Sequence, residues 1–405
     1  MMSFKQFLLE GGAAGHMAHP FDLTNVNSGR DLINVFNKLA NSLVKKPSVV
    51  KIDGVNTSIR LITDAEGKKQ FAMDRGSNKN EDVEGVTMDK LSLRFPAGHG
   101  MIETGKTVLD IFNTAIPGIE KELQKLGMWD NNQILFNMEY VKGATNVVGY
   151  ASNFLAIHGL NKIISVKSPV KGSVSRASQE IPYDKKALET LIEKVDPIAK
   201  KRGFDVSHEF VVKMDKKIDF NDVLNSKFTV NYDTRNIVTK PLKEWLSKAT
   251  NPRAEKIALA SGKKIAAMSL ENYKNLSAGV PMHQYIGDNA KDMEKAIAGA
   301  VLYHATIMLG QKIKDVATSE LGNVGTQEGI VVRDTSISPN PVKITGNFIL
   351  GKEAGKFAKK TENEEGGITG QIKSVNRVNN PFNYQTNPAY GREGARLTLT
   401  PGSNI

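Results

Sequence analysis

The chain has 405 residues, no cysteine and a formal net charge of +11. The lack of cysteine excludes disulfide scaffolds, thiolate catalysis and cysteine-based zinc sites, and no apolar run approaches the roughly 18 residues that a membrane helix needs. Because 40% of the residues are apolar, we expect a cytoplasmic globular protein, and its basic excess would attract nucleic acid, although an ordinary solvated surface can carry the same charge.

Residues 1–29 are expected to form an N-terminal leader or tail. Residues 3–10 are a short amphipathic run, and the glycine-rich stretch 11–15 would end any helix. This start resembles the capsid-targeting leaders of T-even-like phage head proteins, and Leu8-Leu9-Glu10 resembles the site of their prohead proteases. The resemblance implies association with a phage head, and packaging in the virion as an alternative to the cytoplasm of an infected host cell.

Helix and strand signals follow one another over the next fifty residues. Apolar residues recur at helical spacing over 30–44, which predicts an amphipathic helix. The β-rich stretches 49–53 and 57–62 predict two strands joined at Gly54, and 70–74 predicts a further short strand.

A long helix and a regular strand are predicted next. Helical spacing over 108–126 is interrupted near Pro117, and Gly127 suits a C-terminal cap. Residues 134–141 alternate with the two-residue period of a strand, which places Glu139 on the same face as Asn137.

The second half of the chain divides into an insertion, two strands and a tail. Residues 181–319 are rich in lysine and helical in pattern, so we expect a helical insertion into a core formed by 30–180 and 320–350. Residues 329–333 and 342–345 predict two strands of that core. The C-terminal tail, residues 351–405, is expected to be loosely ordered.

Lys51 opens a Lys-x-Asp-Gly element at the end of a predicted strand. A nucleophilic lysine has to be unprotonated near pH 7, so its pKa has to fall below the ordinary value of about 10.4. A strand inside a pocket would provide the desolvation that this requires. A lysine on the protein surface can, however, occur in the same Lys-x-Asp-Gly pattern.

Five short motifs occur in a fixed order: Lys51 to Asn56, Asp74-Arg75-Gly76, 136–140, 328–333 and 342–345. In this order they resemble motifs I, Ia, III, IV and V of the covalent nucleotidyltransferases, the superfamily of ATP-dependent polynucleotide ligases and mRNA-capping enzymes. The first motif most resembles the phage RNA ligase 2 family. The resemblance implies an α+β nucleotidyltransferase fold, an ATP-grasp-like ligase adenylation fold of antiparallel sheets with flanking helices.

The resemblance assigns catalysis to Lys51, Asp53 and Lys343. Lys51 would attack the α-phosphorus of ATP to form a lysyl-AMP, and Lys343 would counter negative charge on the α-phosphate. Glu328 would hold Mg²⁺ or Mn²⁺, for which oxygen ligands are suited. Alternatively, Glu328 and Glu139 are ordinary strand residues whose side chains point into solvent.

Binding of the ATP cofactor, as AMP, is assigned to eight further residues: Gly54, Asn56, Arg75, Glu139, Phe154, Ile157, Gly329 and Val331. Arg75 would contact a phosphate through its planar donor fork, Asn56 would orient the adenylate, and Glu139 would accept a hydrogen bond from the ribose. Either Phe154 or Ile157 would stack on the adenine.

The sequence departs from the family pattern in motif V, where Thr345 stands in place of the second lysine of Lys-x-Lys. Either Lys352 or Lys356 supplies that charge, or one ligation step is slowed. Asn56 stands where DNA ligases carry arginine, which favours RNA over DNA. Few residues follow motif V, so little room is left for an oligonucleotide-binding barrel, and the lysine-rich run 185–202 is a candidate clamp or a solvated helix face.

The expected function is an ATP-dependent RNA ligase that transfers AMP from Lys51 to a 5′-phosphate and then joins that end to a 3′-hydroxyl. One alternative is another nucleotidyltransferase, either a DNA ligase or a capping-type guanylyltransferase. The other is a catalytically altered phage head or interaction protein with this fold. His16 and His19 have a spacing that could suit a metal, but they lie in a glycine-rich segment.

Overall fold

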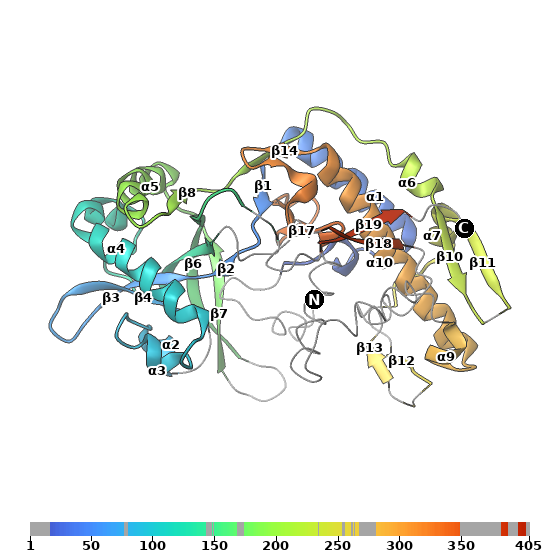
Figure 1. Cartoon of the computed structure of the whole chain (residues 1–405), viewed down its shortest axis with the longest axis horizontal. Coiled ribbons are helices and arrows are strands. Elements are labelled where there is room, and N and C mark those ends of the chain that lie inside the picture. The colour runs from blue at the N-terminus through green and yellow to red at the C-terminus, as the bar shows by residue number, and fades with distance from the viewer. Residues whose placement is uncertain are drawn as a thin grey trace. The chain divides into compact units, whose positions relative to one another are not determined.

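The protein contains two compact units of mixed helix and sheet (Figure 1). In this computed structural model the described residues are 17–76, 80–142, 148, 150–167, 174–233, 235–252, 256–260, 262, 264–266, 281–348, 382–387 and 396–401. Among these, unit 1 spans 52–210, and unit 2 combines 17–51 with the residues from 211 onward. Most of the expected leader and most of the expected C-terminal tail lie outside the described residues.

Unit 1 is built on a largely antiparallel sheet with the order β4-β3-β5-β6-β7. In addition β2 pairs with β5, and β8 pairs with β6 in the parallel sense. The strands are β2 (Val55–Asn56), β3 (Ile59–Thr63), β4 (Lys69–Met73), β5 (Ile134–Val141), β6 (Phe154–Lys167), β7 (Val174–Ile181) and β8 (Asp205–Ser207). The strand predicted over 134–141 is confirmed as β5.

The helices in the described part of unit 1 are α2 (Asn80–Glu84), α3 (Leu91–Arg94), α4 (Gly100–Lys125) and α5 (Lys185–Lys200). The helix α4 begins where the His99 side chain accepts a hydrogen bond from the backbone of Met101, and it ends at Gly127, whose φ of 72° suits glycine. The predicted interruption at Pro117 is wrong, because α4 is continuous. Proline removes one backbone hydrogen bond, and the buried apolar face of α4 keeps the helix in place.

The core of unit 1 lies between the sheet and the helices α4 and α5. Phe71, Phe112 and Phe136 come from β4, α4 and β5, and their ring centroids lie 5.4 to 6.3 Å apart. All three side chains are fully buried. Aromatic contacts of this kind add to the free energy gained by burial, so the sheet is a rigid base for the residues on its opposite face.

Unit 2 is built on an antiparallel sheet with the order β15-β14-β9-β1-β16-β17. Its strands are β1 (Ser48–Lys51), β9 (Val211–Lys213), β14 (Thr318–Ser319), β15 (Gly322–Asn323), β16 (Gly329–Val332) and β17 (Val342–Ile344). The strands predicted over 329–333 and 342–345 are confirmed as the neighbours β16 and β17. Ala18, from the expected leader, bridges to Val342 at the edge of this sheet.

The described part of unit 2 also contains helices and two-stranded hairpins that are separate from this sheet. The helices are η1 (Pro20–Asp22), α1 (Gly29–Lys45), α6 (Asn221–Asn225), α7 (Leu242–Lys248), α9 (Met282–Ile286), α10 (Ala290–Val316) and η3 (Val324–Thr326). The hairpins pair β10 (Lys227–Asn231) with β11 (Ile237–Pro241), β12 (Lys256–Ala258) with β13 (Lys264–Ala266), and β18 (Phe382–Asn387) with β19 (Arg396–Pro401). The helix predicted over 30–44 is confirmed as α1.

The helix α10 is the centre of unit 2, with α1 and α7 packed against it. From Ala296 to Ile307 every side chain is buried, so the helix is enclosed on all sides. A helix that is apolar around its whole circumference belongs in a core. Consequently any charged side chain on this helix that turns inward has to find its partners inside the protein.

The expected helical insertion over 181–319 is distributed over both units. Its first part, through residue 210, lies in unit 1, and the rest lies in unit 2. The range is not purely helical, because β9 and β14 extend the sheet that contains β1 and β16. These strands are two or three residues long, which is too short for a periodic sequence signal.

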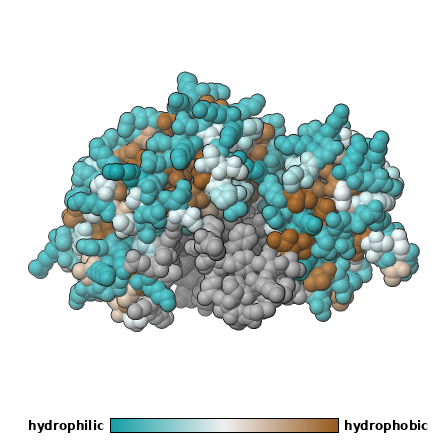
Figure 2. All heavy atoms as spheres, turned by 180° about the vertical axis from the view of Figure 1, so that it is seen from behind, coloured by the Kyte–Doolittle hydropathy of each residue, from teal (hydrophilic) through white to brown (hydrophobic). Residues whose placement is uncertain are grey.

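The surface of the described residues carries few large apolar side chains. Figure 2 shows mostly hydrophilic residues over one face, with hydrophobic ones in small groups. The large apolar side chains exposed to solvent are scattered singly over the chain: Val44, Val83, Met88, Leu93, Val211, Ile237 and Val316. Among the described helices, none has the length and apolarity required to cross a membrane.

Candidate functional site

One face of the sheet in unit 2 carries two of the predicted catalytic lysines. Lys51 is opposite Gly329 in the β1–β16 pairing, and Lys343 is opposite Val331 in the β16–β17 pairing. Residues opposite each other in an antiparallel pair point to the same face, as do residues two apart on a strand. Lys51, Val331 and Lys343 therefore share one face, called the lysine face below.

The opposite face of the same sheet is apolar. Val50, Ile330 and Ile344 are opposite one another across β1, β16 and β17, and each is at most 1% exposed. The methyl group of Ile344 lies against α10 at Gly310, where an added Cβ would be 3.1 Å from it. Burial of this face fixes the strand register, and that register places both lysines on the other face.

Lys51 forms an ion pair with Glu328. The distance from Lys51 Nζ to Glu328 Oε1 is 2.7 Å, and the Glu328 side chain is 6% exposed while that of Lys51 is 18% exposed. A carboxylate at this distance stabilises the ammonium form of the lysine. The structure thus brings together the predicted nucleophile and the predicted metal ligand.

Gly329 is required by the close approach of the chain at the end of β17. A Cβ at this position would lie 2.2 Å from the carbonyl oxygen of Ile344 and 3.1 Å from Thr345 Cα. No side chain fits there without a shift of the backbone. The glycine after Glu328 therefore has a packing reason, and it allows β17 to lie close to the ion pair.

A third lysine, which sequence analysis did not select, lies at the same end of the sheet. Lys314 of α10 is 1% exposed, and its ammonium donates to the carbonyl oxygens of Gln327 at 2.7 Å, Thr345 at 3.1 Å and Glu328 at 3.4 Å. Burial lowers the pKa of Lys314 from 10.5 to about 7. The signal in the sequence is the apolar run 296–309 just before it, which encloses the helix.

Thr345, the departure in motif V, is nearly buried. Its hydroxyl is 3.4 Å from His19 Nδ1, and its carbonyl accepts from Lys314. His19 stacks on Phe21, so it is part of a packed segment, while His16 lies outside the described residues. Lys352 and Lys356, which were expected to replace the missing charge, also lie outside them.

Asp53 and Gly54 lie in unit 1, directly after the chain leaves unit 2 at Lys51. The Asp53 backbone donates to Tyr150 Oη at 2.9 Å, and its carboxylate accepts from the backbone of Val148 at 3.1 Å. A Cβ on Gly54 would lie 3.0 Å from both Glu139 Oε2 and the carbonyl oxygen of Tyr140. Asp53 therefore orders its own loop, and Gly54 lets that loop lie close to β5.

A polar group lies on one face of the sheet in unit 1. Asn56 is opposite Glu139 in the β2–β5 pairing, and its side-chain amide donates to Asn137 Oδ1 at 3.1 Å. Asn137 and Glu139 are two apart on β5, which puts the three side chains on one face, called the Glu139 face below. The predicted common face of Asn137 and Glu139 is confirmed.

Arg75 is anchored beside the Glu139 face. Its Nη1 donates to the carbonyl oxygen of Asn56 at 2.6 Å, and burial is the main cause that lowers the pKa of its guanidinium. Arg75 forms no ion pair with any carboxylate of the described residues. Its Nη1 also lies 3.6 Å from Met101 Sδ, and the carboxylates of Asp82 and Glu139 attract its charge at longer range.

Neighbouring arginines, in contrast, are neutralised by two buried aspartates. Asp74 forms an ion pair with Arg60 and accepts from both terminal nitrogens of Arg176, and Asp82 pairs with Arg94 at 2.8 Å. Both aspartates are fully buried. This network holds the turn around Arg75 in place.

The two candidates for adenine stacking lie on different faces of β6. Phe154 is opposite Val141, on the Glu139 face, whereas Ile157 is opposite Met138 and fully buried in the hydrophobic core. Phe154 is itself only 3% exposed, and the Ile157 side chain faces the core. The strand alternation and the register shift after Asn137 turn its side chain inward. Phe154 packs edge-on against Tyr150 and Phe210.

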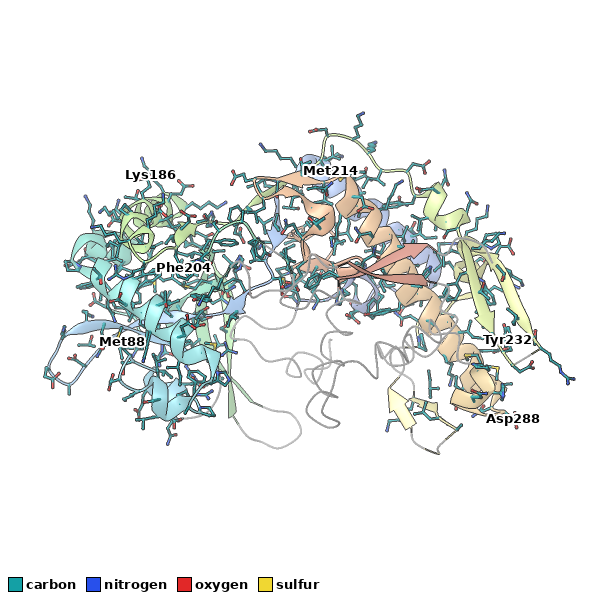
Figure 3. All side chains as sticks on the ribbon, viewed as in Figure 1. Met88, Lys186, Phe204, Met214, Tyr232 and Asp288 are labelled. Carbon is teal, nitrogen blue, oxygen red and sulfur yellow. The ribbon has the colours of Figure 1, made fainter. Side chains whose placement is uncertain are left out.

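The lysine-rich run of the candidate clamp is partly neutralised. Lys194 pairs with Glu122 at 2.8 Å, Lys200 pairs with Asp196 at 2.6 Å, and Arg202 pairs with Asp110. Lys186 extends outward from α5, while Phe204 points into unit 1 (Figure 3). The described part of this run is typical of a solvated helix face.

The described residues contain no group of three or more histidine, aspartate or glutamate side chains placed to hold a metal ion. Comparison of the chain with family models and with curated proteins found no match.

Proposed function

We propose that the protein is an ATP-dependent polynucleotide ligase of the RNA-joining kind, with a nucleotidyltransferase fold, that forms a lysyl-AMP at Lys51. The observation that carries the proposal is the pair between Lys51 Nζ and Glu328 Oε1 at 2.7 Å, with Lys343 on the same sheet face. A nucleophilic amine, a carboxylate and a second cation are the groups that attack on an α-phosphate requires.

In the first step the neutral Lys51 amine attacks the α-phosphorus of ATP. A phosphorus–nitrogen bond forms, the bond to the bridging oxygen breaks, pyrophosphate leaves, and the amine proton passes to solvent. Lys343 offsets the negative charge that develops on the α-phosphate oxygens. In the later steps the AMP is transferred to a 5′-phosphate and is displaced by a 3′-hydroxyl.

Glu328 has two partners in this scheme. In the structure its carboxylate pairs with Lys51, whereas attack on phosphorus requires a neutral amine. A divalent cation held by Glu328 would supply charge that offsets the phosphates. Attack requires that the Lys51 amine leave this ion pair and lose its proton to solvent.

The residues of unit 1 fit nucleoside and phosphate binding as the resemblance implies. Glu139 and Asn56 supply an acceptor and an amide on one face, Phe154 supplies an aromatic ring on that face, and Arg75 has donors without a carboxylate partner. The preference for RNA over DNA rests on Asn56 in the first motif, as does the likeness to the RNA ligase 2 family.

Incubation with Mg²⁺ and ATP labelled at the α-phosphate tests the proposal. We expect label on the wild-type protein and none on Lys51→Ala. Lys46→Ala is a matched control, because Lys46 also pairs with a buried carboxylate, Asp334, at 2.7 Å in the same unit. Label from GTP in place of ATP would indicate a capping-type enzyme, and label on neither nucleotide would indicate a protein that has lost the reaction.

A further inference from the structure

The ammonium of Lys314 joins the starting end of β16 to the terminal end of β17. Its three acceptors are the carbonyl oxygens of Gln327 and Glu328, which precede β16, and of Thr345, which follows β17. An ammonium has three N–H donors, so the number of donors matches the number of carbonyls. One side chain thereby ties together the segments that carry Glu328 and Lys343.

Other residues of α10 reinforce this junction. Gly310 allows Gly346 to approach, with 3.4 Å between an added Cβ and the Gly346 nitrogen, and Gln311 Oε1 accepts from the backbone of Asn347 at 3.0 Å. Gly346 has a φ of 52°, in the left-handed region that favours glycine. Residues 310, 311 and 314 thus form one turn of helix that contacts the chain after β17.

Placing an ammonium in this buried position costs desolvation free energy. Among the described residues no carboxylate forms an ion pair with Lys314, so its charge is offset by the three carbonyl dipoles and, at longer range, by the carboxylates of Asp315 and Glu328. An apolar side chain of similar length would avoid the desolvation cost. What the ammonium provides, and an apolar side chain does not, is a fixed geometry for the three carbonyls.

We propose that Lys314 is a positioning residue, whose ammonium holds the backbone at Glu328 and Thr345 so that the Glu328 carboxylate stays on Lys51 and β17 stays in register. Lys314 also donates to the backbone carbonyl of Thr345, the residue that departs from the motif V pattern. The role in adenylation rests on the proposed function, whereas the effect on the Lys51–Glu328 pair does not.

Reductive methylation of lysines, followed by mass spectrometry in the absence of nucleotide, measures this effect. The ion pair protects the Lys51 amine, so we expect Lys51 to react several-fold faster in Lys314→Met than in the wild type. Lys194, paired with Glu122 in unit 1, is the internal reference and should keep its rate. Lys312→Met is the matched control, because Lys312 is on the same helix, pairs with Asp222 and touches neither strand.

Two further variants keep the test decisive. Lys314→Gln retains two donors without the charge and should give an intermediate rate, and Lys314→Arg should restore protection in part. An unchanged Lys51 rate in folded Lys314→Met overturns the proposal. If both Met and Gln variants unfold as a whole, with Lys194 reacting as fast as Lys51, Lys314 is a folding residue only and the proposal is equally refuted.

Activity gives a second readout that separates the two proposals. With lysyl-AMP formation established, Lys314→Met should lower its rate at saturating ATP by about tenfold or more, because small misplacements of reacting groups have effects of this size. The ATP concentration for half-maximal rate should change little. A wild type that forms no adduct refutes the proposed function, while the methylation result still tests Lys314.

Discussion

Acid should destabilise unit 2 through His304, a fully buried residue of α10. Burial lowers the pKa of His304 from 6.5 to about 3. Below pH 6.5 the unfolded chain binds a proton at this ring that the folded protein does not bind, so stability is lost progressively between pH 6.5 and pH 3. Between pH 7 and pH 5 the loss is about 2 kcal/mol, at 1.36 kcal/mol for each pH unit below 6.5.

Urea denaturation followed by tryptophan fluorescence measures this loss. The chain has two tryptophans, and Trp245 of α7 lies in unit 2, where its ring contacts Phe228, which in turn contacts the His304 ring at 4.8 Å. In a Trp129→Phe background, Trp245 reports unit 2 alone. Added to that background, His304→Phe should remove about 2 kcal/mol of the difference between pH 7 and pH 5. The same pH dependence with and without His304 would refute the reasoning.

Four substitutions test the candidate site. Gly329→Ala should lower the free energy of unfolding by about 1–3 kcal/mol in urea titrations, because its Cβ would overlap the Ile344 carbonyl; unchanged stability would contradict the close approach. Glu328→Gln should reduce adduct formation on the order of 100-fold in a labelling time course while the protein stays folded, and wild-type labelling would exclude a role for the carboxylate. Phe154→Leu should weaken ATP binding in calorimetry, whereas Ile157→Val should leave affinity unchanged and cost about 1 kcal/mol of stability; the reverse pattern would place the adenine on the other face of β6.

Much of the arrangement around Lys51 could be predicted from the sequence, because strand alternation is a local property. The strands with Lys51, Gly329 and Lys343 were predicted within one or two residues of their bounds. Their order in the sheet was not predicted, since it depends on pairings between segments hundreds of residues apart. The common face of Lys51 and Lys343 follows only from that pairing.

What the sequence analysis missed has the same physical origin. The inward face of Ile157 depends on a register shift that has no sequence signal, and the continuity of α4 through Pro117 depends on packing that outweighs one lost hydrogen bond. In the sequence, Lys314 looks like any other lysine of a helix. Only the burial of α10 shows that its side-chain nitrogen lies inside the protein.

The most direct measurement is peptide mapping by mass spectrometry after incubation of the protein with ATP and Mg²⁺. We expect a single AMP adduct, carried by the peptide that contains Lys51 and attached through its side-chain nitrogen. An adduct on a different residue, or an unmodified Lys51 peptide under conditions in which the protein is folded and binds ATP, would contradict this expectation.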